Sequence, residues 1–182
     1  MSRIFLTAVL TIAYAAAPAM QGPAATGTTG AMPAAAAALV DESGRGIGDA
    51  RLQQTPHGVL LRLDLKNATP GVHGIHLHEV GRCDAPSFES AGGHFSVDSR
   101  VHGFLNPSGP HAGDLPNIFV PASKELSIEF LIPDVTLDPG PRSLLDTNGS
   151  AIVIHADQDD HFSDPAGHTG DRLACGPIVA GR

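Results

Sequence analysis

The chain contains ten histidines, and several of them stand at spacings at which imidazole side chains can meet. His76 and His78 are two residues apart in residues 71–78 (GVHGIHLH). Because successive side chains of a strand point to opposite faces, these two imidazoles share one face and Ile75 and Leu77 share the other. Two imidazoles on one face can bind the same metal ion. The pair therefore predicts part of a metal site.

Further candidate ligands follow in the chain, and most stand beside glycines. They are His94, His102, His111, Asp114 and His155. Imidazole with one carboxylate is a typical closed zinc set, and imidazole also suits copper. Six histidines and an aspartate are too many for one ion, so we expect two adjacent ions. We expect the remaining histidines to be solvated on loops: His57, His73, His161 and His168.

The overall charge limits the partners that this chain can have. The formal net charge is −8 with histidine neutral, Lys and Arg number only 11, and the sequence contains no basic run. Such a surface does not favour binding to nucleic acid or to an anionic membrane. The 21 glycines and 15 prolines are typical of many turns and short strands.

The first residues resemble an export signal. Residues 1–19 combine a positive start at Arg3, an apolar run and a small-residue cleavage site at Ala17–Pro18–Ala19, which predicts a secretory signal peptide. An uncleaved anchor is the alternative, although the run is short for a membrane span. Residues 20–36 are rich in Ala, Gly and Pro and predict a flexible lead-in. We therefore expect a periplasmic or secreted protein with no stable membrane partner after cleavage.

The rest of the chain, residues 37–182, predicts an all-β domain. The expected strands are residues 50–54, 59–66, 71–78, 117–120, 126–132, 150–155 and 173–179. In the third of these we expect Val72, Ile75 and Leu77 to face the core. Short strands joined by Gly/Pro turns favour a sandwich or a barrel. Residues 81–116 and 156–171 do not fit strands, and loops of this length in a compact domain are usually functional.

Cys83 and Cys175 are the only cysteines. An even count in an exported protein favours one disulfide, whereas two buried free thiols are the alternative. Closing so long a loop would stabilise the fold by up to about 4–5 kcal/mol in the chain-entropy model.

Taken in order, five sequence blocks resemble the copper–zinc superoxide dismutase family of the bacterial exported type. The blocks are GVHGIHLHEVGRC, SAGGHF, HGFLNPSGPHAGDLPN, VIHADQDD and GDRLACGPI. The resemblance covers residues 37–182. It implies an immunoglobulin-like, eight-stranded Greek-key β-barrel or sandwich, with two metal ions bound outside it under two long functional loops.

The resemblance also implies roles for individual residues. The residues matching copper ligands are His76, His78, His94 and His155, and those matching zinc ligands are His94, His102, His111 and Asp114. His94 would then be an imidazolate shared by both ions and would pass a proton to the departing product. Asp159 matches an aspartate that hydrogen-bonds one histidine of each ion, and Arg172 matches the arginine that attracts the anionic substrate. Cys83 and Cys175 match the family disulfide.

The activity implied is the disproportionation of superoxide to O₂ and H₂O₂, with copper alternating between Cu²⁺ and Cu⁺ and zinc in a structural role. The alternative is an exported copper- and zinc-binding protein of the same fold without turnover; a copper-only dismutase and a zinc hydrolase fit the residues less well. Ser96–Val97 follow Phe95 where many relatives have Asn-Pro, and residues 156–171 are poor in lysine, which bears on electrostatic guidance. A homodimer and a monomer both remain compatible with the sequence.

Overall fold

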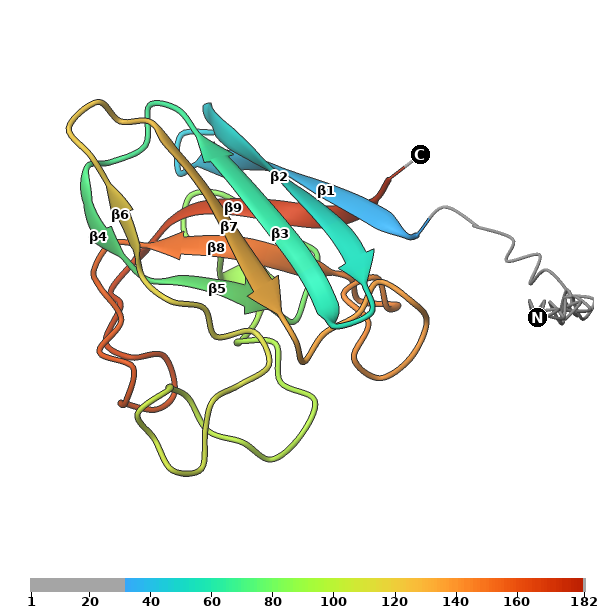
Figure 1. Cartoon of the computed structure of the whole chain (residues 1–182). Helices are drawn as coiled ribbons and strands as arrows, with labels where there is room; N and C mark the ends of the chain where they lie inside the picture. The colour runs from blue at the N-terminus through green and yellow to red at the C-terminus, as the bar shows by residue number, and fades with distance from the viewer. Residues whose placement is uncertain (1–31, 182) are drawn as a thin grey trace, which may run out of the picture. The chain divides into compact units, whose positions relative to one another are not determined.

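The computed structural model describes residues 32–181, and its regular secondary structure is almost entirely β-strand (Figure 1). The elements are β1 (Ala34–Asp41), β2 (Gly46–Thr55), β3 (Gly58–Leu65), β4 (Gly71–His73), β5 (Ile75–His78), the short 3₁₀ helix η1 (Glu89–Ala91), β6 (Ile118–Val120), β7 (Leu126–Ile132), β8 (Ser150–His155) and β9 (Arg172–Ala180). The predicted signal peptide, residues 1–19, and most of the predicted lead-in lie outside the described residues.

The strands form a curled antiparallel sheet (Figure 1). Seven strands pair in the order β5-β8-β9-β1-β2-β3-β7, and β4 pairs with β6. Gly74 alone separates β4 from β5, so these two are one bent strand and the expected eight are present. Because β3 pairs with β7 rather than with β4, the order is that of a Greek key. The prediction of an all-β Greek-key fold is confirmed.

Alternating side chains build the core of this sheet. In β3 the buried residues are Val59, Leu61, Leu63 and Leu65, and Arg62 points outward. Across the ladder, Leu61 lies opposite Phe130 of β7, which is also buried. The period of two that predicted these strands is therefore the period of their burial.

Two expectations about the edges of the domain were wrong. β1 begins at Ala34, so residues 34–36 of the predicted flexible lead-in belong to a strand. The alanines of this strand alternate between buried and exposed positions, but a run of alanines shows no alternation of apolar and polar residues in the sequence. In β4, Val72 is 41% exposed, whereas His73 is only 3% exposed. The period of two places residues 73, 75 and 77 on one face, so His73 occupies the core-facing position that we expected for Val72.

Two long segments lie beneath the sheet, near β5 (Figure 1). They are residues 79–117, which contain η1, and residues 156–171. The predicted disulfide, Cys83–Cys175, is present and joins the first segment to β9, with Cα atoms 5.7 Å apart. A third segment without strands, residues 133–149, is attached to β2 because Gln54 Oε1 accepts hydrogen bonds from Thr136 Oγ1 and Leu137 N. None of the described helices is long and apolar enough to cross a membrane.

Candidate metal centre

Four histidines from three parts of the chain meet at the face of the sheet that the two long segments cover. His76 and His78 lie on β5, His155 ends β8, and His94 comes from the segment 79–117. One ring nitrogen of each lies within 4.8 Å of the corresponding nitrogens of the others. His76 and His78 point away from the core, as predicted, but the loops bury both.

The nitrogens in this group have the chemistry of metal ligands. Among the described residues, no hydrogen-bond partner is found for His76 Nδ1, His78 Nε2, His94 Nε2 or either ring nitrogen of His155. Buried polar atoms are seldom left without a partner, because each costs about 1–3 kcal/mol. A copper ion fits such a set of imidazole nitrogens.

Hydrogen bonds at the opposite ring atoms fix which nitrogen is free. The Nε2–H of His76 donates to Asp159 Oδ2 at 2.8 Å, and the Nδ1–H of His78 donates to the Gly92 carbonyl at 3.0 Å. Each ring therefore turns an unprotonated nitrogen toward the group's centre.

A second group lies directly beside the first and consists of His76, His94, His102 and Asp114. Asp114 Oδ1 is 2.9 Å from His94 Nδ1, 3.1 Å from His102 Nδ1 and 3.4 Å from His111 Nδ1. Ligand atoms about 2.0 Å from a tetrahedral zinc ion are about 3.3 Å apart. The spacing of three imidazole nitrogens around one carboxylate oxygen therefore fits zinc.

Asp159 connects the two groups. Its Oδ2 accepts from His76 Nε2 at 2.8 Å and its Oδ1 accepts from His102 Nε2 at 2.9 Å. The main chain of Asp159 is held in turn by the side chain of Asn117, which accepts from the Asp159 N–H and donates to its carbonyl, both at 2.8 Å. The role of Asp159 follows from the sequence resemblance, whereas that of Asn117 does not.

Gly167 packs against the same carboxylate. It has φ of +65°, a conformation that residues with a Cβ rarely adopt. A Cβ at this position would overlap Asp159 Oδ1 and come within 2.7 Å of His102 Nε2. Only glycine leaves room for the bridge between the two groups.

Arg172, at the start of β9, is fastened beside the four-histidine group. Its guanidinium donates to the carbonyls of Phe88 at 2.7 Å and Gly92 at 2.8 Å. The Gly92 carbonyl is thus shared by Arg172 and His78. Together with His78, His94 and His155 of that group and several residues of the segment 156–171, Arg172 lines an open cavity of about 580 Å³.

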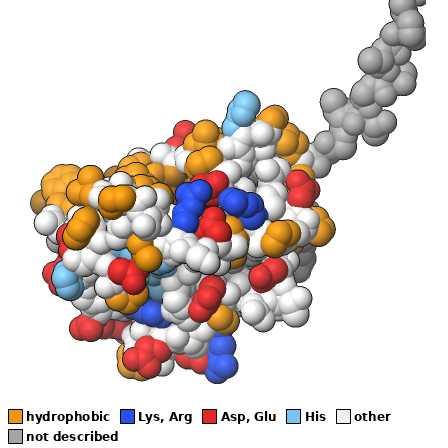
Figure 2. Space-filling model, turned by 90° about the horizontal axis from the view of Figure 1, so that it is seen from below, with side chains coloured by type: hydrophobic (Ala, Val, Ile, Leu, Met, Phe, Trp, Pro, Cys, Tyr) orange, Lys and Arg blue, Asp and Glu red, His pale blue; other side chains and the backbone are white. Residues whose placement is uncertain are grey.

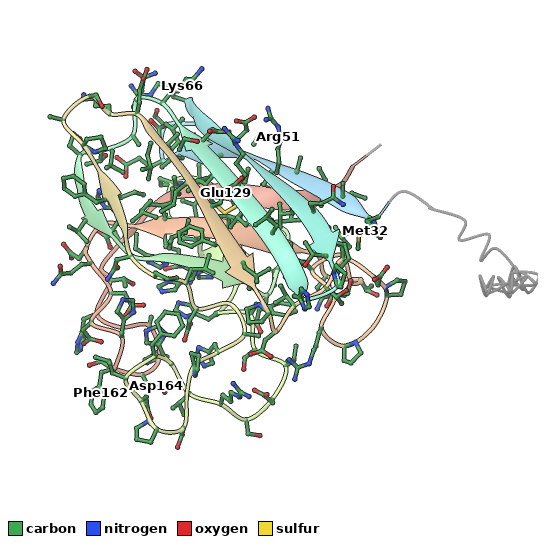
Figure 3. All side chains as sticks on the ribbon, in the orientation of Figure 1. Met32, Arg51, Lys66, Glu129, Phe162 and Asp164 are labelled. Carbon is green, nitrogen blue, oxygen red and sulfur yellow. A yellow bond between two sulfur atoms is a disulfide. The ribbon has the colours of Figure 1, made fainter. Side chains whose placement is uncertain are left out.

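The loop face around this cavity is acidic. Figure 2 shows acidic side chains spread over it, with histidine atoms recessed between them. Figure 3 labels Asp164 and Phe162 on the segment 156–171, which contains no Lys or Arg. Because Arg172 is the only Lys or Arg among the residues described as lining the cavity, it is the permanent positive charge available to an anion there.

Burial sets the protonation of the histidine rings. Burial, with a smaller contribution from neighbouring positive charge, lowers the pKa of His78 and of His155 to about 2 and that of His94 to about 4. These rings are therefore neutral at pH 7, as metal ligands must be. Burial also lowers the pKa of His102, but hydrogen bonds to Asp114 and Asp159 outweigh this effect and raise the pKa to about 9. Burial raises the pKa of Asp114, but hydrogen bonds from His102 and its neighbours hold it far below the usual range.

The expectation that four histidines are solvated is wrong for His73. Its Nδ1 lies 2.8 Å from the His155 carbonyl and its Nε2 lies 2.9 Å from the Thr69 carbonyl. His57 and His168 are exposed, and the half-buried His161 packs against Phe104 with ring centres 5.2 Å apart. The period of two in residues 71–78 was a signal that could have found His73.

Comparison with known proteins agrees with this centre. The family model described as copper/zinc superoxide dismutase (SODC) matches residues 47–178. The chain is 46% identical over 142 residues to "Superoxide dismutase [Cu-Zn] 1" of Aquifex aeolicus, covering 77% of this chain and 84% of that protein. It is 47% identical over 138 residues to "Superoxide dismutase [Cu-Zn]" of Caulobacter vibrioides, covering 74% and 79%.

A solved structure is similar as well. The crystal structure of a SOD-like protein from Bacillus subtilis matches with a TM-score of 0.76 and 36% identity, covering 79% of this chain and 97% of that one. From its fold, its two adjacent groups of candidate metal ligands and these matches, the chain belongs to the copper/zinc superoxide dismutase family.

Proposed function

We propose that this protein catalyses the disproportionation of superoxide, in which two O₂⁻ and two protons give O₂ and H₂O₂. We assign copper to the first group of side chains and zinc to the second. The copper ligands are His76, His78, His94 and His155; the zinc ligands are His94, His102, His111 and Asp114. The activity is that named for the relatives from Aquifex aeolicus and Caulobacter vibrioides.

The observation that carries this proposal is the position of His94 between the two groups. Its Nδ1 lies 2.9 Å from Asp114 Oδ1, on the zinc side, and its Nε2 is buried without a hydrogen-bond partner, on the copper side. A ring placed in this way supports a shared ligand. His76 also belongs to both groups, but its Nε2 is bonded to Asp159, which leaves only Nδ1 for an ion.

The residues around the cavity then have defined tasks. Bound copper supplies the one-electron chemistry, because it has two accessible oxidation states and zinc does not. Arg172 offers a fixed guanidinium to the small anion, since its carbonyl partners Phe88 and Gly92 hold it in place. His94 Nε2 is the atom at which a proton for the departing peroxide can be held. Asp159 keeps the rings of His76 and His102 in one orientation.

Removal of one copper ligand tests the assignment. His155→Ala in the metal-loaded protein should abolish superoxide turnover while zinc stays bound, because His155 belongs only to the first group. His57→Ala, at an exposed histidine, is the matched control and should keep both metals and full activity. Retained turnover in His155→Ala would contradict the copper assignment. Copper binding by the unmodified protein without turnover would indicate the alternative, an exported metal-binding protein.

We also infer that the chain is exported to the periplasm or secreted, without a stable membrane partner once its signal is removed. The Cys83–Cys175 disulfide supports this location, since such bonds persist in oxidising compartments. Cell fractionation of the producing bacterium tests the inference, and recovery in the cytosol with both thiols reduced would contradict it. A homodimer is likewise a proposal, and sedimentation velocity distinguishes it from a monomer.

A further inference from the structure

We propose that His168 is a second anion-attracting residue at the mouth of the cavity beside the four-histidine group, and that it carries a positive charge only in acid. The proposal rests on the proposed function, since superoxide is the anion concerned. His168 lies on the segment 156–171 and lines the same open cavity as Arg172. Its side chain is 83% exposed, so it lies at the rim of the cavity, where an incoming anion passes.

The main chain on both sides fixes the position of His168 at this rim. Gly167, the residue before it, is buried against the Asp159 carboxylate. Thr169, the residue after it, is only 2% exposed, and its carbonyl accepts from the Asp157 N–H at 2.8 Å. Because both neighbours are held against the body of the protein, the exposed side chain between them stays at the edge of the cavity.

The groups around His168 leave the rim short of positive charge. Its Nδ1 lies 3.1 Å from Asp160 Oδ2. The cavity lining adds the carboxylate Asp164 from the same segment, the zinc-assigned His111 from the segment 79–117 and Arg172 from β9. The other titratable groups of the lining are three rings that burial keeps neutral at pH 7: His78, His94 and His155.

The partner of His168 stays negative throughout the range in which an imidazole titrates. Hydrogen bonds from the main chain and side chain of Ser163 hold the pKa of Asp160 well below its usual range. A histidine is the side chain whose charge ordinarily changes between about pH 5 and 8. With His168 neutral, the pair with Asp160 is negative; with His168 protonated, the pair has no net charge. Acid therefore removes one negative charge from the rim and favours the entry of an anion.

Two substitutions isolate this charge from the shape of the loop. Lysine in His168→Lys is positive across this pH range and glutamine in His168→Gln is neutral, and both keep an N–H donor for Asp160. The φ of His168 is +56°, and both replacements are unbranched at Cβ, so they carry the same backbone strain. We expect the two variants to have equal melting temperatures. His57→Lys adds the same charge at an exposed histidine on the turn between β2 and β3 and is the control for net charge.

The readouts are the affinity of the copper- and zinc-loaded protein for azide, followed in the Cu²⁺ absorption spectrum, and kcat/KM for superoxide. At low ionic strength the unmodified protein should match His168→Lys at about pH 5.5 and His168→Gln at about pH 8.5. Between these limits both quantities should differ about 2–5-fold, the more acidic condition favouring the anion. In about 1 M salt the difference should vanish, because an exposed charge is then screened within about 3 Å. His57→Lys should follow the unmodified protein at each pH.

Equal azide affinities in His168→Lys and His168→Gln at low ionic strength would overturn the proposal. So would a difference that persists in high salt, or an unmodified protein that follows one variant at every pH. An effect of His57→Lys as large as that of His168→Lys would assign the attraction to net charge instead.

These outcomes are distinct from failure of the proposed function. If azide affinity depends on residue 168 in a protein without turnover, the dismutase reaction is excluded and the role of His168 stands. If superoxide turns over and neither readout depends on residue 168, only the role of His168 fails. A protein that binds no copper would contradict both.

Discussion

Asp159 Oδ1 lies 2.9 Å from Nε2 of His102, although the two residues are 57 positions apart and come from different long segments. The other oxygen of the same carboxylate accepts from His76 of β5. One side chain therefore holds a histidine of each proposed metal-ligating group and joins both loops to the sheet.

Loss of this carboxylate should weaken metal binding. In Asp159→Asn one of the two histidine donors faces an amide NH₂ instead of an acceptor, so one ring loses its orientation. We expect copper affinity to fall about 10–100-fold, measured by chelator competition. Asp157→Asn, an exposed aspartate in the same segment, is the control and should bind copper normally. Unchanged affinity in Asp159→Asn would mean that the carboxylate does not orient the ligands.

Gly167→Ala should reproduce the loss seen in Asp159→Asn. The new Cβ would overlap the Asp159 carboxylate, and its φ of +65° is strained for alanine by about 1–2 kcal/mol. Gly44→Ala is matched for strain, because Gly44 has φ of +80° but open space around its Cα. We expect both to lower the melting temperature and only Gly167→Ala to release metal. Equal metal content in the two variants would refute the steric argument.

Reduction of the Cys83–Cys175 disulfide should lower stability and activity together. The free energy of unfolding of the metal-free protein should fall by about 2–5 kcal/mol, measured by urea denaturation. Turnover should also fall, because the carbonyls that hold Arg172 belong to Phe88 and Gly92 in the loop that the disulfide ties down. A double variant with both cysteines replaced by alanine should show the same losses and no further response to reductant.

Arg172→Lys tests whether a positive charge alone is sufficient. Lysine keeps the charge but cannot make the forked pair of hydrogen bonds to Phe88 and Gly92. We expect kcat/KM for superoxide to lie between the value of the unmodified protein and that of Arg172→Ala, which should be about 10-fold lower or more. Arg82→Lys, at an exposed arginine of the segment 79–117 that also contains Phe88 and Gly92, should have no effect. Full activity in Arg172→Ala would place the anion site elsewhere.

The stability of the metal-free protein should pass through a maximum near pH 7. The folded-state pKa values of His78, His94 and His155 are lowered to about 2, 4 and 2, so the unfolded chain binds these protons first and stability falls as pH drops below 6.5. The pKa of His102 is raised to about 9, so its stabilising contribution is present below 6.5 and is lost as pH rises toward 9.

Because four histidines with a lowered pKa, His76 included, act on the acid side and His102 alone acts on the alkaline side, the acid limb should be the steeper. Each proton corresponds to a slope of about 1.4 kcal/mol per pH unit. Urea denaturation in the presence of a chelator between pH 4.5 and 9 measures both limbs. The variant His102→Asn should flatten the alkaline limb only, and an unchanged limb would show that His102 is not its source.

The sequence by itself determined the chemistry of the centre and most of the sheet. Residue type and order establish three features of the centre. They are the set of side chains that can donate to a metal, the two-residue spacing of His76 and His78, and the pairing of the only two cysteines. The strands at β3 and β7 follow from a period of two that is local to each segment.

Only the tertiary structure decided how the donors are held. The Gly92 carbonyl accepts hydrogen bonds from both His78 and Arg172, which lie far apart in the chain. Gly167 packs closely on the Asp159 carboxylate, which in turn binds histidines of distant segments. The burial of His73 against the His155 carbonyl is of the same kind. Main-chain carbonyls are present at every residue, so the sequence carries no mark of which ones will be acceptors. That choice is made by the curvature of the sheet and by the loops that fold over it.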